Sequence, residues 1–567
     1  MKDEHVSRIR VISIATILFA LLLIVKLYYV QVVSGNEFEE RADRQYVKPV
    51  GGVFDRGSIF FEAKDGTLMA AASLKIGYTL ALNPKLLKDP EEAYRWLSEI
   101  VPLTREDFFA KATKKDDPYE EIARRIDPDL AEKIEDLDIP GVNVYKEKWR
   151  YYPGESLAAH VLGFVGYKNN ELGGRYGLEN QYNPILRRGD ENLYVNFFAE
   201  VFSDIQKTFS DTGTSEGDIV STIEPNVQAF LEKQLLTISE TYKSKISGGI
   251  IINPRTGEIY SLAANPAFNP NTFHKEDSVG VFTNPLVQNV YEMGSIMKPL
   301  TMAAGLDSGA VTAKTTYNDV GSMTLNNKTF YNFDGVGRGV VNMQEVLNQS
   351  LNTGVAFVVK KMGNKNFANY MYKYGFGKST GIDLPSEAKG LVDSLKNLRD
   401  IELATASFGQ GLAISPIAMT RALSALANNG ILTTPHVVKK IDYKVGFSKT
   451  ITFPGGERVI KPETAKEISR MLTEVVDTAL LDGKVKMEHY SIAAKTGTAQ
   501  MAKPGGGYYD DKFLHSFFGY FPSFDPKFLI FLYTVEPQEK YAATTLTQPF
   551  MNITKFLINY YEVPPDR

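Results

Sequence analysis

Residues Tyr291 to Asp307 read YEMGSIMKPLTMAAGLD, an interruption at glycine followed by an apolar run at helical spacing. Proline is tolerated only near the start of a helix, because it lacks an N–H group and clashes with the preceding turn. Pro299 therefore predicts a helix that begins just before it, after Gly294. Ser295 should lie at or just inside the first turn, and Lys298, three residues on, should share its face.

This turn supplies a nucleophile and a base. The positive end of a helix dipole favours the negative charge that develops on the Ser295 oxygen during attack. The Lys298 ammonium, partly desolvated by Met293 and Met297, can lose its proton and act as the base. Ser-x-x-Lys alone is weak evidence, because about two matches are expected by chance in a chain this long. The downstream sequence therefore has to support the pair.

The first supporting motif is Ser350-Leu351-Asn352, which follows a helical stretch at 342–348. We expect Ser350 to relay a proton between Lys298 and a leaving amine. We expect the Asn352 side chain to anchor Lys298 and a substrate amide.

The second motif, Lys495-Thr496-Gly497-Thr498, lies inside a predicted strand. Lys495 supplies positive charge for the lysine–serine pair and for an anionic substrate end, and Thr496 and Thr498 offer hydroxyls to a carboxylate. Gly497 leaves room for a substrate backbone to approach the strand edge. The N–H groups of Ser295 and Thr498 are the expected oxyanion hole.

Composition excludes several other chemistries. The chain has 567 residues, a formal net charge of −4, no cysteine and six histidines. The slight negative charge and the lack of a sustained basic run argue against a nucleic-acid partner. Thiolate catalysis is excluded, and the histidines lack metal-ligand spacing. We therefore expect no metal and no cofactor.

The N-terminal segment predicts a membrane anchor. Residues 11–33 are nearly all apolar, and as a helix they span roughly 34 Å, enough to cross a bilayer. Basic residues precede the run and acidic residues follow it, which places residues 1–10 in the cytoplasm and the rest of the chain outside. These flanking charges are Lys2, Arg8 and Arg10 before the run, and Glu37, Glu39 and Glu40 after it.

Residues 34–214 predict a mixed α+β domain. Alternation over 51–82, around a turn at 64–66, indicates two strands. Helical periodicity covers 89–100 and 118–137. A further strand is expected at 142–152.

Residues 215–567 predict an α+β catalytic domain. A helix is expected at 226–239, and strands come from both ends of the segment, with mostly helical patterns between them. This order predicts one antiparallel sheet flanked by helices. The expected strands are 248–252, 258–263, 490–500, 515–522 and 528–535, with a turn at 253–257 and a flexible connection at 502–513.

The three motifs, in this order, resemble the signature of penicillin-binding proteins and serine β-lactamases. The resemblance extends to GDIVSTIEPN at 217–226, INPRTGE at 252–258 and GQGL at 409–412. RGSI at 56–59 and HVLGFVG at 160–166 resemble the pedestal, or dimerisation-type, domain of class B members. The pedestal is then 34–214 and the transpeptidase domain 215–567. Ser350-Leu351-Asn352 is closer to division-type than to elongation-type members.

The resemblance implies a membrane-anchored peptidoglycan D,D-transpeptidase. Ser295 attacks D-Ala-D-Ala stem peptides, an amine of a neighbouring stem peptide takes the acyl group, and β-lactams inhibit. Expected partners are these peptides, the membrane, a polytopic SEDS-type glycan polymerase and the division or elongation machinery. One alternative is a non-catalytic scaffold that activates such a polymerase. Another is a D,D-carboxypeptidase or β-lactamase, although Glu345-Val-Leu-Asn348 is one residue short of a β-lactamase ExxLN motif and precedes Ser350.

Overall fold

The structure, a computed structural model, describes residues 54–114, 117–168, 171–188, 216–444, 446–453 and 455–567, together with Phe19 and Lys26. The predicted anchor at 11–33 otherwise lies outside these residues. Within them, none of the helices combines the length and the apolar character that crossing a bilayer requires. The described chain forms two compact units: one is Leu74–Trp149, and the other combines Arg56–Ser73 and Arg150–Arg188 with the residues from 216 onward. The predicted domain boundary at 214/215 stays a prediction.

The smaller unit packs three helices against three strands. The distal part of β2 (Leu68–Leu82) pairs with β4 (Val142–Tyr151) and runs antiparallel to β3 (Glu120–Ile126). Their apolar side chains form a separate core with those of the helices, which are α3 (Pro90–Ile100), α4 (Arg105–Ala112) and α5 (Pro128–Glu135).

The helix predicted across 118–137 is wrong in its first half, where β3 lies. Pro128 cannot sit inside a helix, and it opens α5 instead, after Asp127 in extended backbone. The apolar residues Ile122 and Ile126 of β3 fit a strand period as well as a helical one. Pairing with β2 decides between the two.

A second sheet opens the larger unit. In it β1 (Ile59–Glu62) pairs antiparallel with the proximal part of β2 and parallel with β7 (Gly217–Ser221). The predicted hairpin around 64–66 is thereby confirmed, with Glu62 opposite Leu68. The order continues from β7 to β15 (Val438–Tyr443) and β16 (Ser448–Thr450).

Beside this sheet lies a buried ion cluster. Glu179 in α7 (Gly177–Gln181) is fully buried and accepts from Arg56 Nε at 2.6 Å and from Arg150 Nε at 2.5 Å. Burial alone raises the pKa of Glu179, but the two guanidinium groups lower it below its ordinary value. The cluster ties residues 56, 150 and 179 together. Helix α7 packs against α6 (Ala159–Leu162), β6 (Glu171–Gly174) and α8 (Asn183–Leu186), and β5 (Val165–Lys168) pairs with β6.

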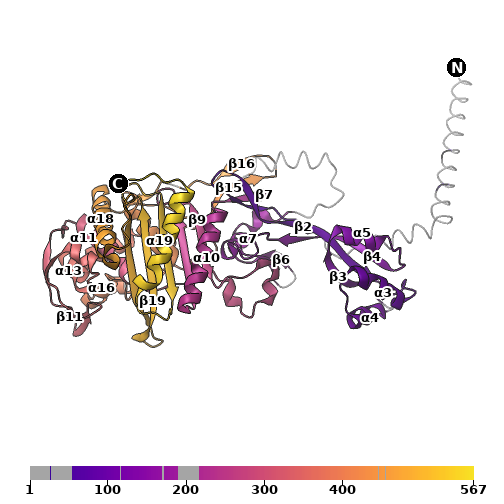
Figure 1. Ribbon diagram of the computed structural model, residues 1–567, viewed down its shortest axis with the longest axis horizontal. Coiled ribbons are helices and arrows are strands. Elements are labelled where there is room, and N and C mark those ends of the chain that lie inside the picture. Colours follow the sequence, from indigo (N-terminus) through magenta and orange to yellow (C-terminus); the bar gives the residue numbers. More distant parts are fainter. Residues whose placement is uncertain are drawn as a thin grey trace, which may run out of the picture. The chain divides into compact units, whose positions relative to one another are not determined.

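The main sheet is antiparallel, as predicted (Figure 1). Its five strands lie in the order β18-β19-β20-β8-β9. It joins strands from both ends of the predicted catalytic domain. All eight residues of β20 are buried, because helices cover both faces of the sheet. The strands are β8 (Ile246–Ile252), β9 (Ile259–Asn265), β18 (Ala493–Ala502), β19 (Tyr508–Phe521) and β20 (Phe528–Val535).

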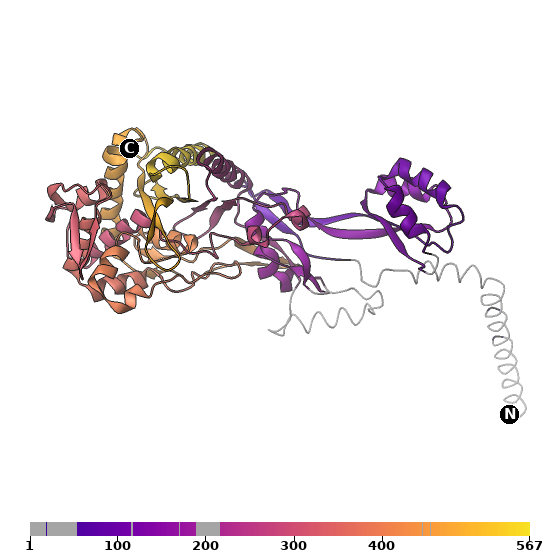
Figure 2. The same cartoon turned by 90° about the horizontal axis from the view of Figure 1, so that it is seen from below.

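Alternate residues of these strands feed two cores. On one face, Ile251 and Leu532 pack with α10 (Pro225–Tyr242) and α19 (Ala542–Tyr560), where the Phe517 and Phe550 rings stack at 4.4 Å. On the other, Ile250 and Phe531 belong to the larger core, which also contains α11 (Lys298–Asp307) and α18 (Pro462–Glu474). Figure 2 shows the sheet between these two layers. Successive side chains of a strand point to opposite faces, so a sheet that is buried on both sides places alternate residues in two different cores.

The flexible connection predicted at 502–513 is mostly strand. Ala502 pairs with Tyr508, so only 503–507 form the turn, closed by Lys503 N–H donating to the Gly507 carbonyl at 2.8 Å. The polar run at 508–512 hides the strand from a reading based on composition. Its backbone groups gain partners in the hairpin, which offsets the low strand propensity of aspartate.

The remaining elements lie between these strands in sequence. They are η2 (Pro270–Lys275), η3 (Val279–Phe282), β10 (Thr316–Asp319) paired with β13 (Gly339–Asn342), β11 (Ser322–Leu325) paired with β12 (Lys328–Tyr331), α12 (Met343–Asn348), α13 (Asn352–Met362), α14 (Asn364–Lys373), α15 (Ser394–Asn397), α16 (Asp400–Ala406), α17 (Pro416–Leu426), and β14 (Ile431–Leu432) paired with β17 (Glu457–Arg458).

Candidate active site

Ser295 lies in a tight turn that leads directly into a helix. The turn is η4 (Gly294–Met297), a 3₁₀ helix, and α11 follows with Pro299 in its first turn, as predicted. Gly294 has φ +64°, and a Cβ there would lie 2.8 Å from the Thr498 carbonyl oxygen. Only glycine permits both this backbone and this close approach. The turn is thus pressed against β18.

A side-chain hydrogen bond and a second close approach at a glycine also hold the turn against β18 and β19. Ser516 on β19 donates from its hydroxyl to the Met293 carbonyl at 2.7 Å. A Cβ at Gly497 would lie 2.4 Å from the Ser516 hydroxyl and 2.8 Å from the Met293 carbonyl oxygen. The space left by the missing side chain of Gly497 is therefore filled by the chain just before Ser295. The sequence predicts that Gly497 leaves room for a substrate backbone. On this side of the strand, the space is instead occupied by the Ser516 hydroxyl and the Met293 carbonyl.

Lys298 is buried behind the turn. Its side chain is 1% exposed, and its Nζ donates to the Ser350 carbonyl oxygen at 2.5 Å and to the Ser350 hydroxyl at 3.1 Å. Burial lowers the pKa of Lys298 well below its ordinary value, and repulsion from the Lys495 ammonium lowers it further. Both effects favour the neutral amine over the ammonium at this position.

Ser350 and Asn352 lie at the junction of α12 and α13. Ser350 has φ +54°, a left-handed backbone between the two helices, and Asn352 is the first residue of α13. The side-chain amide nitrogen of Asn352 (Nδ2) donates to the Tyr331 carbonyl at 2.8 Å. The expected contact to Lys298 is therefore made by Ser350, while the Asn352 amide is held by β12.

On β18, Lys495 is 4% exposed and donates to the Thr496 carbonyl at 3.2 Å, and burial lowers the pKa of Lys495 to about 8. The Thr498 hydroxyl accepts from the Ala542 N–H at 3.1 Å, where α19 begins. Thr498 thus holds the start of a helix, besides facing the cleft.

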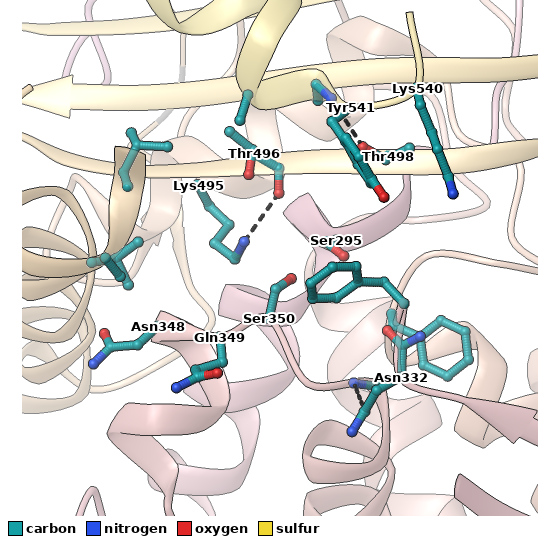
Figure 3. A pocket seen from close by; sticks show the side chains of 18 of the residues that line it. Ser295, Asn332, Asn348, Gln349, Ser350, Lys495, Thr496, Thr498, Lys540 and Tyr541 are labelled. Atoms are coloured by element: carbon teal, nitrogen blue, oxygen red, sulfur yellow. Dashed lines mark hydrogen bonds between the residues drawn. The ribbon is translucent and has the colours of Figure 1, made fainter. Parts of the chain in front are cut away.

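These residues open onto one cleft of about 1160 Å³ (Figure 3). Ser295, Ser350, Asn352, Lys495, Thr496 and Thr498 all line it. Lys298 and Gly497 are not among its lining residues. In Figure 3 the Ser295 side chain lies between the β18 side chains and Ser350.

Sequence reasoning missed much of the cleft wall. One side carries aromatic side chains, for which the run Phe330-Tyr331 with Phe333 in a polar loop was a visible signal. Another is the segment after α18, where the π-helix η5 (Val475–Ala479) runs into η6 (Leu480–Gly483), and Leu481 and Asp482 have positive φ. The remaining missed lining residues include Asn332, Arg338, Gln349, Gln500, Asp510, Phe513, Lys540 and Tyr541.

None of the described residues that line the cleft is a histidine. His515 is fully buried on β19, and its two ring nitrogens lie 2.9 Å from the Thr545 hydroxyl and 3.1 Å from the Lys540 carbonyl oxygen. Burial lowers its pKa to about 4. In the described part of the chain, no group of three or more acidic or histidine side chains is arranged to hold a metal ion.

A serine at a helix start, a buried lysine one turn on and a lysine-bearing strand beside them define a serine acyltransferase of the penicillin-binding fold. A family profile of the penicillin-binding protein transpeptidase domain matches residues 248–555, and a profile of the penicillin-binding protein dimerisation domain matches 55–215. The chain therefore belongs to the penicillin-binding protein family. Within it, this is a class B member of division type, a peptidoglycan D,D-transpeptidase.

Curated relatives agree with this placement. Stage V sporulation protein D of Bacillus subtilis is 29% identical over 94% of this chain and 82% of its own length. Peptidoglycan D,D-transpeptidase FtsI of Escherichia coli is 28% identical over 78% of this chain and 73% of its own length.

Solved structures share the fold. Penicillin-binding protein 2X of Streptococcus thermophilus aligns with a TM-score of 0.73 at 21% identity, over 90% of this chain and 81% of that one. Penicillin-binding protein 3 of Mycobacterium tuberculosis, solved in complex with aztreonam, aligns with a TM-score of 0.69 at 21% identity, over 91% of this chain and 98% of that one. At this identity the likeness concerns the fold alone.

Proposed function

We propose that Ser295 is the nucleophile and neutral Lys298 the base of the transpeptidation. The observation that carries this is the buried Lys298 amine, one helical turn from Ser295 and bonded to Ser350. Lys298 Nζ takes the Ser295 proton as the oxygen attacks the carbonyl of the penultimate D-alanine. The N–H groups of Ser295 and Thr498 stabilise the resulting oxyanion.

Ser350 then completes acylation. Its hydroxyl, 3.1 Å from Lys298 Nζ, passes the proton to the amine of the departing D-alanine as the peptide bond breaks. The product is an ester between the Ser295 oxygen and the stem peptide. Lys495 and the hydroxyls of Thr496 and Thr498 hold the carboxylate end of the donor. β-Lactams, which carry a comparable carboxylate and a reactive amide, acylate Ser295 by the same route.

An amine of a neighbouring stem peptide resolves the ester. It attacks the ester carbonyl, loses its proton through Ser350 and Lys298, and releases the Ser295 oxygen, which regains that proton. A carboxypeptidase or β-lactamase would use water instead. Glu345, the acid of the shortened ExxLN motif, does line the cleft. Its two oxygens accept from the side-chain amides of Asn348 at 2.9 Å and Gln349 at 3.3 Å, so it is held as part of the wall.

The experiment is gel labelling with a fluorescent penicillin, followed by a chase. Wild-type protein should label covalently and Ser295→Ala should not label at all. Transpeptidation is supported by two results. The fluorescent label is lost only slowly in water, and an acyl group loaded from a thioester analogue of the stem peptide passes rapidly to an added amine. Rapid loss of label in water would support the β-lactamase alternative.

The membrane anchor at 11–33 is part of the proposal, with residues 1–10 in the cytoplasm and the catalytic domain outside the cell membrane. The apolar run and its flanking charges support it. Full-length protein should pellet with membranes and need detergent, and protein lacking residues 1–33 should be soluble and label normally. Full-length protein in the supernatant would disprove the anchor.

The cellular role proposed is septal wall synthesis beside a SEDS-type glycan polymerase. The division-type Ser350-Leu351-Asn352 motif supports the septal role. A fluorescent fusion should gather at midcell in dividing cells. Ser295→Ala should fail to replace the wild-type protein; full complementation by that variant would favour the scaffold alternative.

A further inference from the structure

Helix α13 begins with a residue that cannot cap it. Leu351 occupies the N-cap position and has no side-chain acceptor for the first N–H groups of the helix. The N–H groups of Asn352 and Thr353 instead donate to the Asn332 side-chain oxygen, at 3.0 and 3.3 Å. The cap is thus supplied from another segment of the chain, 20 and 21 residues upstream.

Asn332 is itself held by a buried carboxyl group. Its amide nitrogen donates to the two Asp319 oxygens at 3.1 and 3.0 Å, and the Thr353 hydroxyl donates to Asp319 Oδ1 at 2.7 Å. The backbone N–H groups of Gly321 and Arg338 each add a bond to Asp319 at 3.1 Å. Asp319, Asn332 and Thr353 are each only 2% exposed. The cluster is therefore closed and fully bonded, which makes it rigid.

This cluster borders the strained residue of the site. A non-glycine residue with left-handed backbone is strained and persists only where its surroundings hold it. Ser350 has such a backbone, two and three residues before the N–H groups that Asn332 fixes. The same backbone directs the Ser350 carbonyl to Lys298 Nζ at 2.5 Å. Figure 3 shows Asn332 and Ser350 together on the side of the cleft that faces β18.

We infer that Asp319 and Asn332 are positioning residues of the acylation step, acting through Thr353 and the start of α13 to hold Ser350 in place for Lys298. The inference rests on the roles proposed above for Ser295, Lys298 and Ser350. Asn332 lines the cleft, but its amide oxygen and nitrogen are both engaged by the protein. Its part is to orient the reacting groups, not to touch the substrate.

The test compares Thr353→Val, which removes the hydroxyl at constant shape, with Thr353→Ser, which keeps it. Acylation by a fluorescent penicillin is followed against its concentration, giving a limiting rate and a half-saturating concentration for each variant. Misplacing reacting groups by about 1 Å costs up to about 100-fold in rate. Thr353→Val should therefore lose about 10- to 100-fold in limiting rate at a nearly unchanged half-saturating concentration, and Thr353→Ser should recover most of it. Asp319→Asn should behave like Thr353→Val.

Asp393→Asn is the control, because it removes a carboxyl group outside the cluster and outside the residues that line the cleft. Asp393 forms an exposed ion pair with Lys396, so its variant should keep the wild-type limiting rate. Melting temperatures show which variants are folded, and if Asp319→Asn is not, the Thr353 pair decides. A wild-type rate in folded Thr353→Val, no recovery in Thr353→Ser, or an equal loss in Asp393→Asn overturns the inference. Labelling of Ser295→Ala would instead overturn the proposed chemistry itself.

Discussion

Lys298 Nζ lies 2.5 Å from the Ser350 carbonyl oxygen and 3.1 Å from its hydroxyl. The carbonyl holds the amine in place, and the hydroxyl offers a path for its proton. Proton transfer thus depends on two residues that are 52 positions apart in sequence. It requires that α11 and the α12–α13 junction keep their relative positions.

We expect Lys298→Ala to acylate with penicillin about 10²- to 10⁴-fold more slowly than wild-type protein, because that is the usual cost of losing a general base. The variant should remain folded, as judged by its circular dichroism and melting curve. Stopped-flow or gel labelling measures the rate.

The matched control for Lys298→Ala is a histidine variant. It combines His274→Ala, at the histidine nearest to Ser295 in sequence, with His515→Gln, which keeps a polar group at a buried position. This variant should acylate at close to the wild-type rate. A dead histidine variant, together with Lys298→Ala at near wild-type rate, would rule out the serine–lysine mechanism.

The three motifs predict which residue types form the site, but they do not predict which side-chain atoms contact one another. Contact between Lys298 and Ser350 was predictable from the Ser-x-x-Lys and Ser-x-Asn motifs. The turning of the Asn352 amide towards Tyr331 was not, because it depends on the left-handed backbone at Ser350 and on a strand 21 residues away. Asp319 was missed for a similar reason. Aspartate in a polar loop usually indicates a turn, and its burial appears only once β10 and β13 pair.

The antiparallel sheet was predictable because β8 and β20 are apolar runs of strand length. The strand residues at 508–513 and the strand at 120–126 were not, since their side chains are largely polar. Pairing with a neighbouring strand decides such segments, and that pairing is a property of the whole chain.

Glu345→Gln should leave the lifetime of the penicilloyl-enzyme in water unchanged. The carboxyl oxygens of Glu345 are engaged by Asn348 and Gln349, so we expect no role for it in activating water. The lifetime is measured by chasing fluorescent label with unlabelled penicillin. A lifetime that lengthens by about tenfold or more, as loss of a general base would give, would make Glu345 a deacylating base and favour the β-lactamase alternative.

Glu179→Gln should unfold far more easily than wild-type protein. The substitution leaves the buried Arg56 and Arg150 without their shared counter-charge, and breaking a buried ion pair costs about 3–5 kcal/mol. Urea denaturation of protein lacking residues 1–33 measures the loss. Glu171→Gln, at an exposed pair with Arg187, is the control and should change stability little.

The same cluster predicts how stability responds to acid. The folded-state pKa of Glu179 lies below its ordinary value of 4.5. Its contribution is therefore fully present above pH 4.5 and is lost as the pH falls through the folded-state value. Wild-type protein should lose stability in that window, and Glu179→Gln should lose less. Equal acid sensitivity of the two proteins would assign the acid loss to other groups.

The last prediction concerns the pH dependence of acylation. The reaction needs Lys298 neutral and Lys495 charged. The rate should rise with pH as Lys298, whose pKa is strongly lowered, loses its proton, and it should fall as Lys495 loses its own near pH 8. In Lys495→Arg the guanidinium stays charged, so the descending limb should move beyond the range in which the protein is stable. Lys540→Arg changes another lysine of the cleft and should leave the limb near pH 8. The rate of penicillin acylation from pH 5 to 10 decides: a limb that persists in Lys495→Arg, or vanishes in Lys540→Arg, would assign the titration to a different group.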